Sequence, residues 1–140
     1  MESELVENAK ALTTIFGEWP SFHDAEVVSM RLDREGTDAP ILEATIHVFL
    51  MTTDVDAKGF FVLTHHTLVT LRFSNILLRQ LRWFNHQNVI SDLLIGSSSR
   101  TDDSEHRAYD VKFGSCWGVE ADLSCDQILV LKAEPFVPKD

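Results

Sequence analysis

The feature that most restricts the fold of this chain is a repeated alternation of apolar and polar residues. Val28, Met30 and Leu32 alternate with polar side chains, and the stretch 42–50 repeats the pattern at greater length. This period of two indicates half-buried β-strands, because successive side chains of a strand point to opposite faces. The other apolar segments that predict strands are 69–73, 76–83, 89–95, 109–113, 117–123 and 128–130.

The N-terminus follows a different period. Leu5, Ala9, Leu12 and Phe16 recur at the spacing of one helical face, and Gly17 follows them as a helix stop. We therefore predict an α+β protein in which an N-terminal helix packs on a curved, mainly antiparallel sheet of about eight strands. The length of 140 residues fits a single domain over residues 1–140.

Polar stretches between these segments predict loops over residues 33–40, 52–64 and 96–105. The second loop contains the stretch 54–59, which superficially resembles a calcium-binding loop. Lys58 stands at the fifth ligand position and His65 at the twelfth, where a bidentate glutamate is needed. We therefore predict that this loop binds no calcium.

The charge of the chain excludes one class of partner. A formal net charge of −10 argues against a protein that binds nucleic acid by neutralising phosphates with lysine and arginine. Acids dominate residues 1–56 and 92–140, whereas residues 57–91 hold bases and no acid. This field either steers a basic partner towards the acidic regions or serves solubility alone.

The apolar runs, the first residues and the cysteines bear on the cellular compartment of the protein. No apolar run approaches the ~20 residues that span a bilayer, and the first residues lack a basic secretory start. We therefore expect a cytoplasmic protein with no membrane partner. The spacing of Cys116 and Cys125 fits neither a zinc knuckle nor a redox pair, so reduced thiols are expected.

The stretch Trp19-Pro20-Ser21-Phe22-His23-Asp24 joins the predicted helix to the first strand. Proline ends the helical course, and Trp19, Pro20 and Phe22 are predicted to anchor the helix against the sheet. His23 and Asp24 are assigned to the same structural motif, with partner contact and metal binding as alternatives. A metal-dependent enzyme would need a third ligand from His65, His66 or His86. These histidines form no spaced helical motif, so we assign neither a metal site nor a catalytic residue.

A second motif, Phe84-Asn85-His86-Gln87-Asn88, is dense in amide and imidazole groups. Such groups suit a tight turn that satisfies its own backbone, or a polar contact surface. We assign Phe84, Asn85 and Asn88 to the turn, and His86 and Gln87 to partner contact. The sequence contains no nucleophile elbow and no phosphate-binding glycine loop, so we predict neither enzymatic activity nor a cofactor.

These two motifs, in this order, resemble the immunity protein 50 family of bacterial polymorphic-toxin systems. The likeness rests on residues 19–27, on residues 84–89 and on Ile128-Leu129-Val130 leading to Glu134-Pro135, and it spans most of the chain. Members of this family are small cytosolic proteins presumed to neutralise a cognate toxin. The resemblance implies a toxin as the partner, without identifying the toxin or the inhibitory surface.

An acidic face that mimics a polyanionic substrate would suit a toxin with a basic, phosphate-binding cleft. The candidate partner-binding residues are Asp102, Asp103, Glu105, Asp110, Glu120, Asp122, His86 and Gln87. Two alternatives from other classes stay open at this point. One is a metal-dependent enzyme built on His23 and Asp24, and the other is an orphan structural or assembly protein.

Overall fold

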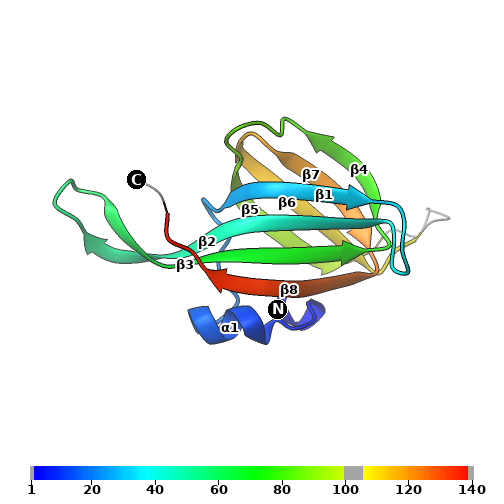
Figure 1. Ribbon diagram of the computed structural model, residues 1–140, viewed down its shortest axis with the longest axis horizontal. Coiled ribbons are helices and arrows are strands. Elements are labelled where there is room, and N and C mark those ends of the chain that lie inside the picture. The colour runs from blue at the N-terminus through cyan, green and yellow to red at the C-terminus, as the bar shows by residue number, and fades with distance from the viewer. Residues whose placement is uncertain (1, 100–105, 139–140) are drawn as a thin grey trace.

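The computed structural model describes residues 2–99 and 106–138. That part of the chain contains a 3-10 helix, a short α-helix and eight strands (Figure 1). The helices are η1 (Glu2–Leu5) and α1 (Lys10–Phe16). The strands are β1 (Glu26–Asp33), β2 (Ile41–Val55), β3 (Phe61–Ser74), β4 (Leu77–Arg82), β5 (Val89–Ser97), β6 (Tyr109–Trp117), β7 (Glu120–Cys125) and β8 (Gln127–Pro135).

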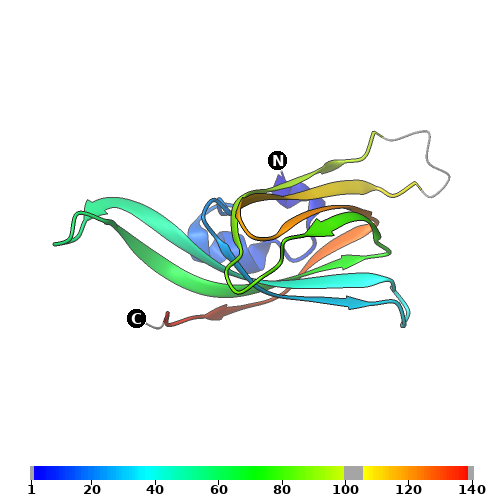
Figure 2. The same cartoon turned by 90° about the horizontal axis from the view of Figure 1, so that it is seen from above.

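All eight strands belong to one antiparallel sheet with the order β4-β7-β6-β5-β1-β2-β3-β8. The sheet folds over between β1 and β5, whose ladder holds the single registered pair of Glu26 and Val89. The half formed by β4, β7, β6 and β5 therefore crosses the half formed by β1, β2, β3 and β8 (Figures 1 and 2). Phe73 of β3 and Phe113 of β6 meet between the halves, with ring centroids 5.9 Å apart.

The core lies between the two halves and follows from the alternation in the sequence. From Leu42 onward the buried side chains of β2 are Leu42, Ala44, Ile46 and Val48, and the residues between them are only half-buried. One buried face per strand is expected where only one face meets another layer. The other strands contribute buried residues that include Val27, Val69, Leu71, Ile90, Val111, Leu123, Ile128 and Val130. The described residues include no helix with the length and apolar character needed to cross a membrane.

The N-terminal segment departs from the predicted continuous helix. Asn8 has a left-handed φ of 59°, and Glu7 forms a parallel bridge with Leu129 at the edge of β8. The helical course therefore splits into η1 and a seven-residue α1, which ends at Gly17 (φ 82°) as the sequence predicts. The bridge joins residues far apart in the chain and does not change the spacing of the apolar residues near the N-terminus. The sequence therefore does not reveal that the helix is interrupted.

The fold is consequently largely β. The eight antiparallel strands confirm the predicted sheet, but the α+β class overstates the contribution of one seven-residue helix. Leu12 of α1 is fully buried, yet the contacts of the helix run mainly to β8, beside which it lies in Figure 1. The helix therefore does not form a layer comparable to either half of the sheet.

The predicted loop over residues 52–64 is wrong. β2 continues to Val55 and β3 begins at Phe61, so only residues 56–60 form the turn. A side-chain oxygen of Asp56 closes this turn by accepting hydrogen bonds from the backbone N–H groups of Lys58 (2.8 Å) and Phe60 (3.0 Å). Neither strand has a buried residue in this stretch, so burial imposed no alternation of apolar and polar residues on the sequence.

Two smaller predictions also need correction. Trp117 ends β6 and does not begin the last but one strand, because Gly118 (φ 78°) turns the chain before β7 starts at Glu120. β5 continues through Ser97, into the loop predicted over residues 96–105. Residues 100–105 of that loop lie outside the described part of the chain.

The aromatic stretch that follows α1 packs against the core. Phe22 is 3% exposed and Pro20 is buried, while Trp19 is half-buried. The rings of Trp19 and Phe22 lie 5.7 Å apart at an interplanar angle of 51°, within the range of a favourable aromatic pair. This pair occupies the passage from the helix to β1.

Candidate functional site

The turn between β4 and β5, residues 83–88, is held by side-chain amides. The Asn88 side chain is buried, and its Oδ1 accepts hydrogen bonds from the backbone N–H groups of Asn85 (2.9 Å) and Val119 (3.1 Å). Its Nδ2 donates to the backbone carbonyl of Asn85 at 2.8 Å. One side chain thus ties the turn to the start of β7 and satisfies backbone groups that burial would otherwise leave unpaired.

Asn85 and Gly118 complete this scaffold. Oδ1 of Asn85 accepts a hydrogen bond from the backbone N–H of Gln87 at 3.0 Å, and its Nδ2 donates to the Trp83 carbonyl at 2.7 Å. Gly118 lies so close to the turn that a Cβ there would stand 2.4 Å from the Gln87 carbonyl oxygen. The turn and the β6–β7 connection are therefore packed backbone against backbone.

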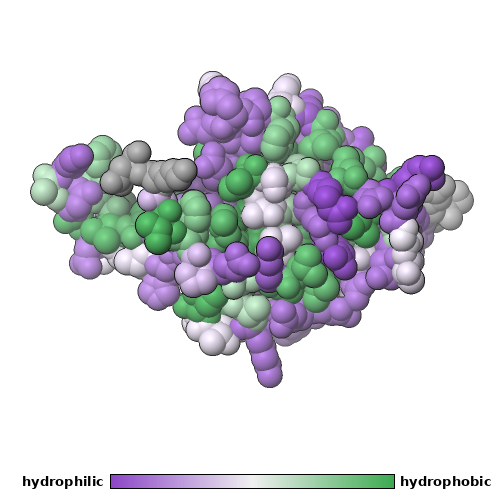
Figure 3. Space-filling view, viewed as in Figure 1, coloured by the Kyte–Doolittle hydropathy of each residue, from purple (hydrophilic) through white to green (hydrophobic). Residues whose placement is uncertain are grey.

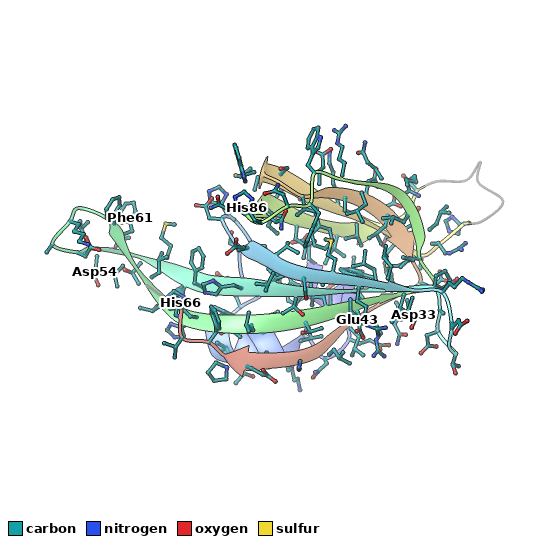
Figure 4. All side chains as sticks on the ribbon, turned by 45° about the horizontal axis from the view of Figure 1, so that its top comes forward. Asp33, Glu43, Asp54, Phe61, His66 and His86 are labelled. Atoms are coloured by element: carbon teal, nitrogen blue, oxygen red, sulfur yellow. The ribbon has the colours of Figure 1, made fainter. Side chains whose placement is uncertain are left out.

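This scaffold presents large aromatic side chains to solvent. Trp83 and Trp117 are each 60% exposed, and Phe84 is 47% exposed. His86 and Gln87 on the same turn are also exposed. We name these five residues the aromatic-turn surface, and Figure 4 shows the position of His86 relative to the β2–β3 hairpin. Grouped exposure of large apolar side chains marks an interaction surface more than isolated exposure does.

Arg82 supports one member of the aromatic-turn surface. Its guanidinium carbon lies 4.0 Å from the centre of the Trp83 ring. Its Nε and Nη2 donate to one carboxylate oxygen of Glu120 at 3.0 and 2.6 Å. Glu120 therefore fixes the arginine, and the arginine stacks on the indole in a cation–π contact. Trp83 itself has a φ of 65°, a conformation that bulky residues rarely adopt.

The described members of the predicted acidic face pair with arginines of β4. Glu120 binds Arg82, and Nη2 of Arg79 lies 3.3 Å from Asp110 and 3.4 Å from Asp122. The structure thus brings these three carboxylates together along β6 and β7, next to compensating positive charge. Outside the described residues lie the remaining acidic candidates, Asp102, Asp103 and Glu105.

His23 and Asp24 lie at the surface beside β5. Nδ1 of His23 donates to the backbone carbonyl of Ser91 at 3.0 Å, and its Nε2 lies 3.6 Å from the Asp24 carboxylate. Residues 2–99 and 106–138 contain no group of three His, Cys, Asp or Glu side chains placed to hold a metal ion. The structure accordingly gathers no such group around His23 and Asp24 from the proposed third ligands, His65, His66 and His86.

The two thiols differ in their surroundings. Cys116 is exposed, Cys125 is buried, and both are free. Burial raises the pKa of the Cys125 thiol to about 12. Cys125 is therefore protonated at neutral pH and unreactive, since the thiolate is the nucleophilic form.

Comparison with known families covers nearly the whole chain. The sequence model of Immunity protein 50 matches residues 8–136, a range that includes both the Trp19–Asp24 stretch and the aromatic turn. The chain belongs to the Immunity protein 50 family. Comparison with curated proteins and with solved structures found no match. The contact surface of this Immunity protein 50 family member therefore has to be argued from its own residues.

The sequence predicts the scaffold of the aromatic turn and its two polar contact residues, His86 and Gln87, but not the exposure of its aromatic side chains. The amides of residues 85–88 predicted a turn, whereas Trp83 and Trp117 were counted as strand residues with apolar character. One signal was available. Trp83 and Phe84 are adjacent, and two neighbouring residues of a strand cannot both face the same core.

Proposed function

We propose that this protein is a non-catalytic immunity protein that neutralises a cognate toxin in the cytoplasm by binding it through the aromatic-turn surface. The observation that carries the proposal is the exposure of Trp83, Phe84 and Trp117 around one hydrogen-bonded scaffold. Tryptophan is enriched among the residues that dominate the free energy of protein binding. A scaffold that is rigid before binding also lowers the entropy lost on association.

Polar and charged groups have a secondary part in this proposal. His86 and Gln87 supply a polar rim of the kind that surrounds an apolar interface centre. The net charge of −10 steers a basic toxin towards the protein. The acidic face that would mimic a polyanion contributes less than the aromatic side chains, because Asp110, Glu120 and Asp122 already pair with arginines.

The proposal is tested by titrating the protein with the toxin encoded beside its gene. We expect Trp83→Ala and Trp117→Ala each to weaken binding by about 30-fold or more, because truncating a hot spot costs ~2 kcal/mol or more. Leu94→Ala is the matched control, since Leu94 on β5 is 51% exposed and lies outside the aromatic-turn surface. Full affinity in both tryptophan variants would contradict this surface assignment.

Salt separates the aromatic contact from charge mimicry. Exposed charges are screened beyond ~8 Å at physiological ionic strength, so a complex held mainly by carboxylates dissociates as salt is added. We expect the wild-type complex to lose affinity only modestly in high salt. Strong salt sensitivity, combined with full binding by the tryptophan variants, would favour the acidic face as the principal contact.

A further inference from the structure

The β2–β3 hairpin continues past the rest of the sheet as a two-stranded arm, which we define as residues 49–65. The pairing of β1 with β2 ends at His47, and the pairing of β8 with β3 ends at Thr67. Beyond these points the registered partners of β2 and β3 are each other, up to Val55 opposite Phe61. Figures 1 and 2 show the arm extending away from both halves of the sheet. An isolated two-stranded hairpin is marginally stable in water, so such an arm gains stability from a partner.

One face of the arm is apolar. Met51 lies opposite Leu63 and Val55 opposite Phe61, and directly paired residues project to the same face. Residues 61 and 63 are two positions apart on β3, so all four side chains share that face. They are between 36% and 57% exposed, and Phe60 at the tip is 68% exposed. Hydrophobic side chains gather over the base of the arm in Figure 3, and Figure 4 shows Phe61 towards its far end.

A cleft of about 270 Å³ opens at the base of the arm. It lies between the arm and the segment that follows α1, and its apolar lining consists of Phe16, Pro20, Phe49, Leu50 and Met51. The polar side chains around it are Glu18, Ser21 and His23. Since small-ligand pockets begin at ~300 Å³, this volume suits one large side chain better than a cofactor.

We propose that two copies of this chain associate through their arms, which lie side by side in opposite directions. In this arrangement the tip of each arm reaches the base of the other, so that Phe60 or Phe61 of one copy enters the cleft of its partner. The contact is isologous and closes as a two-fold dimer, because each copy supplies both a tip and a cleft. The free edges of the arm strands provide unpaired backbone groups for contacts between the copies.

The charge of the arm favours a second copy of the chain, and not a basic toxin, as the partner that binds it. The arm contains the charged residues Asp54, Asp56 and Lys58, and therefore carries −1 of a net charge of −10. Copies of an acidic chain repel each other over most of their surface, but little along this face. Lys58 lies at the tip and Glu18 beside the cleft, so the antiparallel arrangement brings opposite charges together. The dimer uses a different surface from the proposed toxin contact and does not depend on it.

Sedimentation equilibrium of the full chain measures this association directly. We expect a monomer–dimer equilibrium in the wild type, and a dissociation constant raised about 30-fold or more in the double variant Phe60→Asp, Phe61→Asp. Trp83→Ala removes an equally exposed aromatic from elsewhere and is expected to leave the equilibrium unchanged. Circular dichroism and thermal melting establish that each variant is folded. A wild type that stays monomeric at its highest soluble concentration, or a dimer indifferent to the phenylalanine substitutions, would overturn the proposal.

A charge exchange tests the contact between tip and cleft without removing apolar area. Lys58→Glu and Glu18→Lys are each expected to weaken the dimer roughly two- to fivefold, as loss of an exposed ion pair does. The double variant is expected to recover wild-type affinity, because the exchanged charges face each other again in a symmetric dimer. Both residues are exposed, so the fold tolerates the changes. Additive losses in the double variant would contradict the antiparallel arrangement.

Discussion

Nε2 of His47 lies 2.9 Å from Nδ1 of His66, so the two imidazoles form a hydrogen bond between β2 and β3. One ring donates and the other accepts, which requires the accepting ring to be neutral. Phe49 and Phe136 pack beside His47, with ring centroids 5.6 and 4.7 Å from its own. Burial lowers the pKa of His47, and the charge of His66 when protonated lowers it further.

This pair makes the stability of the fold depend on pH. The pKa of His47 is lower in the folded chain than in the unfolded chain, so the unfolded chain takes up a proton first as the pH falls. The contribution of neutral His47 to the free energy of unfolding is therefore complete above about pH 6.5. It is lost as the pH falls through the lower pKa of the folded chain. Glu26 on β1 and Glu134 on β8 lie in the same register row of the sheet as His47. We expect the melting temperature to fall between roughly pH 7 and pH 5.

His47→Gln tests this prediction because it removes the imidazole, and we expect the melting temperature of this variant to depend less on pH. Glu43, further along the same face, titrates below this range. Although burial raises the pKa of Glu43, hydrogen bonds from Arg72 and Arg31 outweigh that effect and lower it. An unchanged pH slope in His47→Gln would assign the dependence to other groups.

Gly118→Ala is expected to destabilise both the fold and the aromatic-turn surface. The new Cβ would lie 2.4 Å from the Gln87 carbonyl oxygen, and the backbone φ of 78° is unfavourable for alanine. Strain of this kind costs about 1–3 kcal/mol before the close contact is counted. Urea denaturation measures the loss, with Gly96→Ala as the control because a Cβ at Gly96 meets no atom within 4 Å. Equal stability of the two variants would mean that the turn is not packed as described.

Asn88→Ala removes the acceptor that the backbone N–H groups of Asn85 and Val119 share. Leaving a buried backbone group without a partner costs about 1–3 kcal/mol, so we expect a clear fall in the urea midpoint. Gln87→Ala on the same turn changes an exposed side chain and is expected to stay within about 0.5 kcal/mol of wild type. If Asn88→Ala matched that control, the amide would not be the organising group of the turn.

The sequence predicted the strands that bury one face and expose the other. Residues 42–48 of β2 alternate because one face meets the core, and the amides of residues 85–88 predict a turn through their own short-range chemistry. The arm was not predicted because Thr53, Asp54 and Val55 are exposed, and a strand without a buried face imposes no pattern on its residues.

The site was harder to predict than the fold for a similar reason. The pairing of Asp110 with Arg79 joins residues 31 positions apart, and no local pattern reports such a contact. Trp117 looked like a core residue because large apolar side chains usually are buried. Its exposure became visible only with the register that places it opposite Val89 at the end of β6.

Phe22→Ala is expected to lower stability by ~3–5 kcal/mol, the usual cost of removing a buried phenylalanine ring. That is a large part of the ~5–15 kcal/mol that holds most domains folded. Trp19→Ala is expected to cost less, because its side chain is only half-buried. Trp19→Phe should cost less again, since the Nε1–H of Trp19 is buried without a hydrogen-bond partner among the described residues.

His23→Ala is the control for this series, because the His23 side chain is 61% exposed and bonds only at the surface. We expect it to stay within about 1 kcal/mol of wild type. Thermal melting ranks the four variants, and toxin binding per folded molecule should be unchanged in all of them, since an anchor between α1 and β1 acts through folding. Trp19→Ala with a wild-type melting temperature and no toxin binding would instead make Trp19 part of the interface.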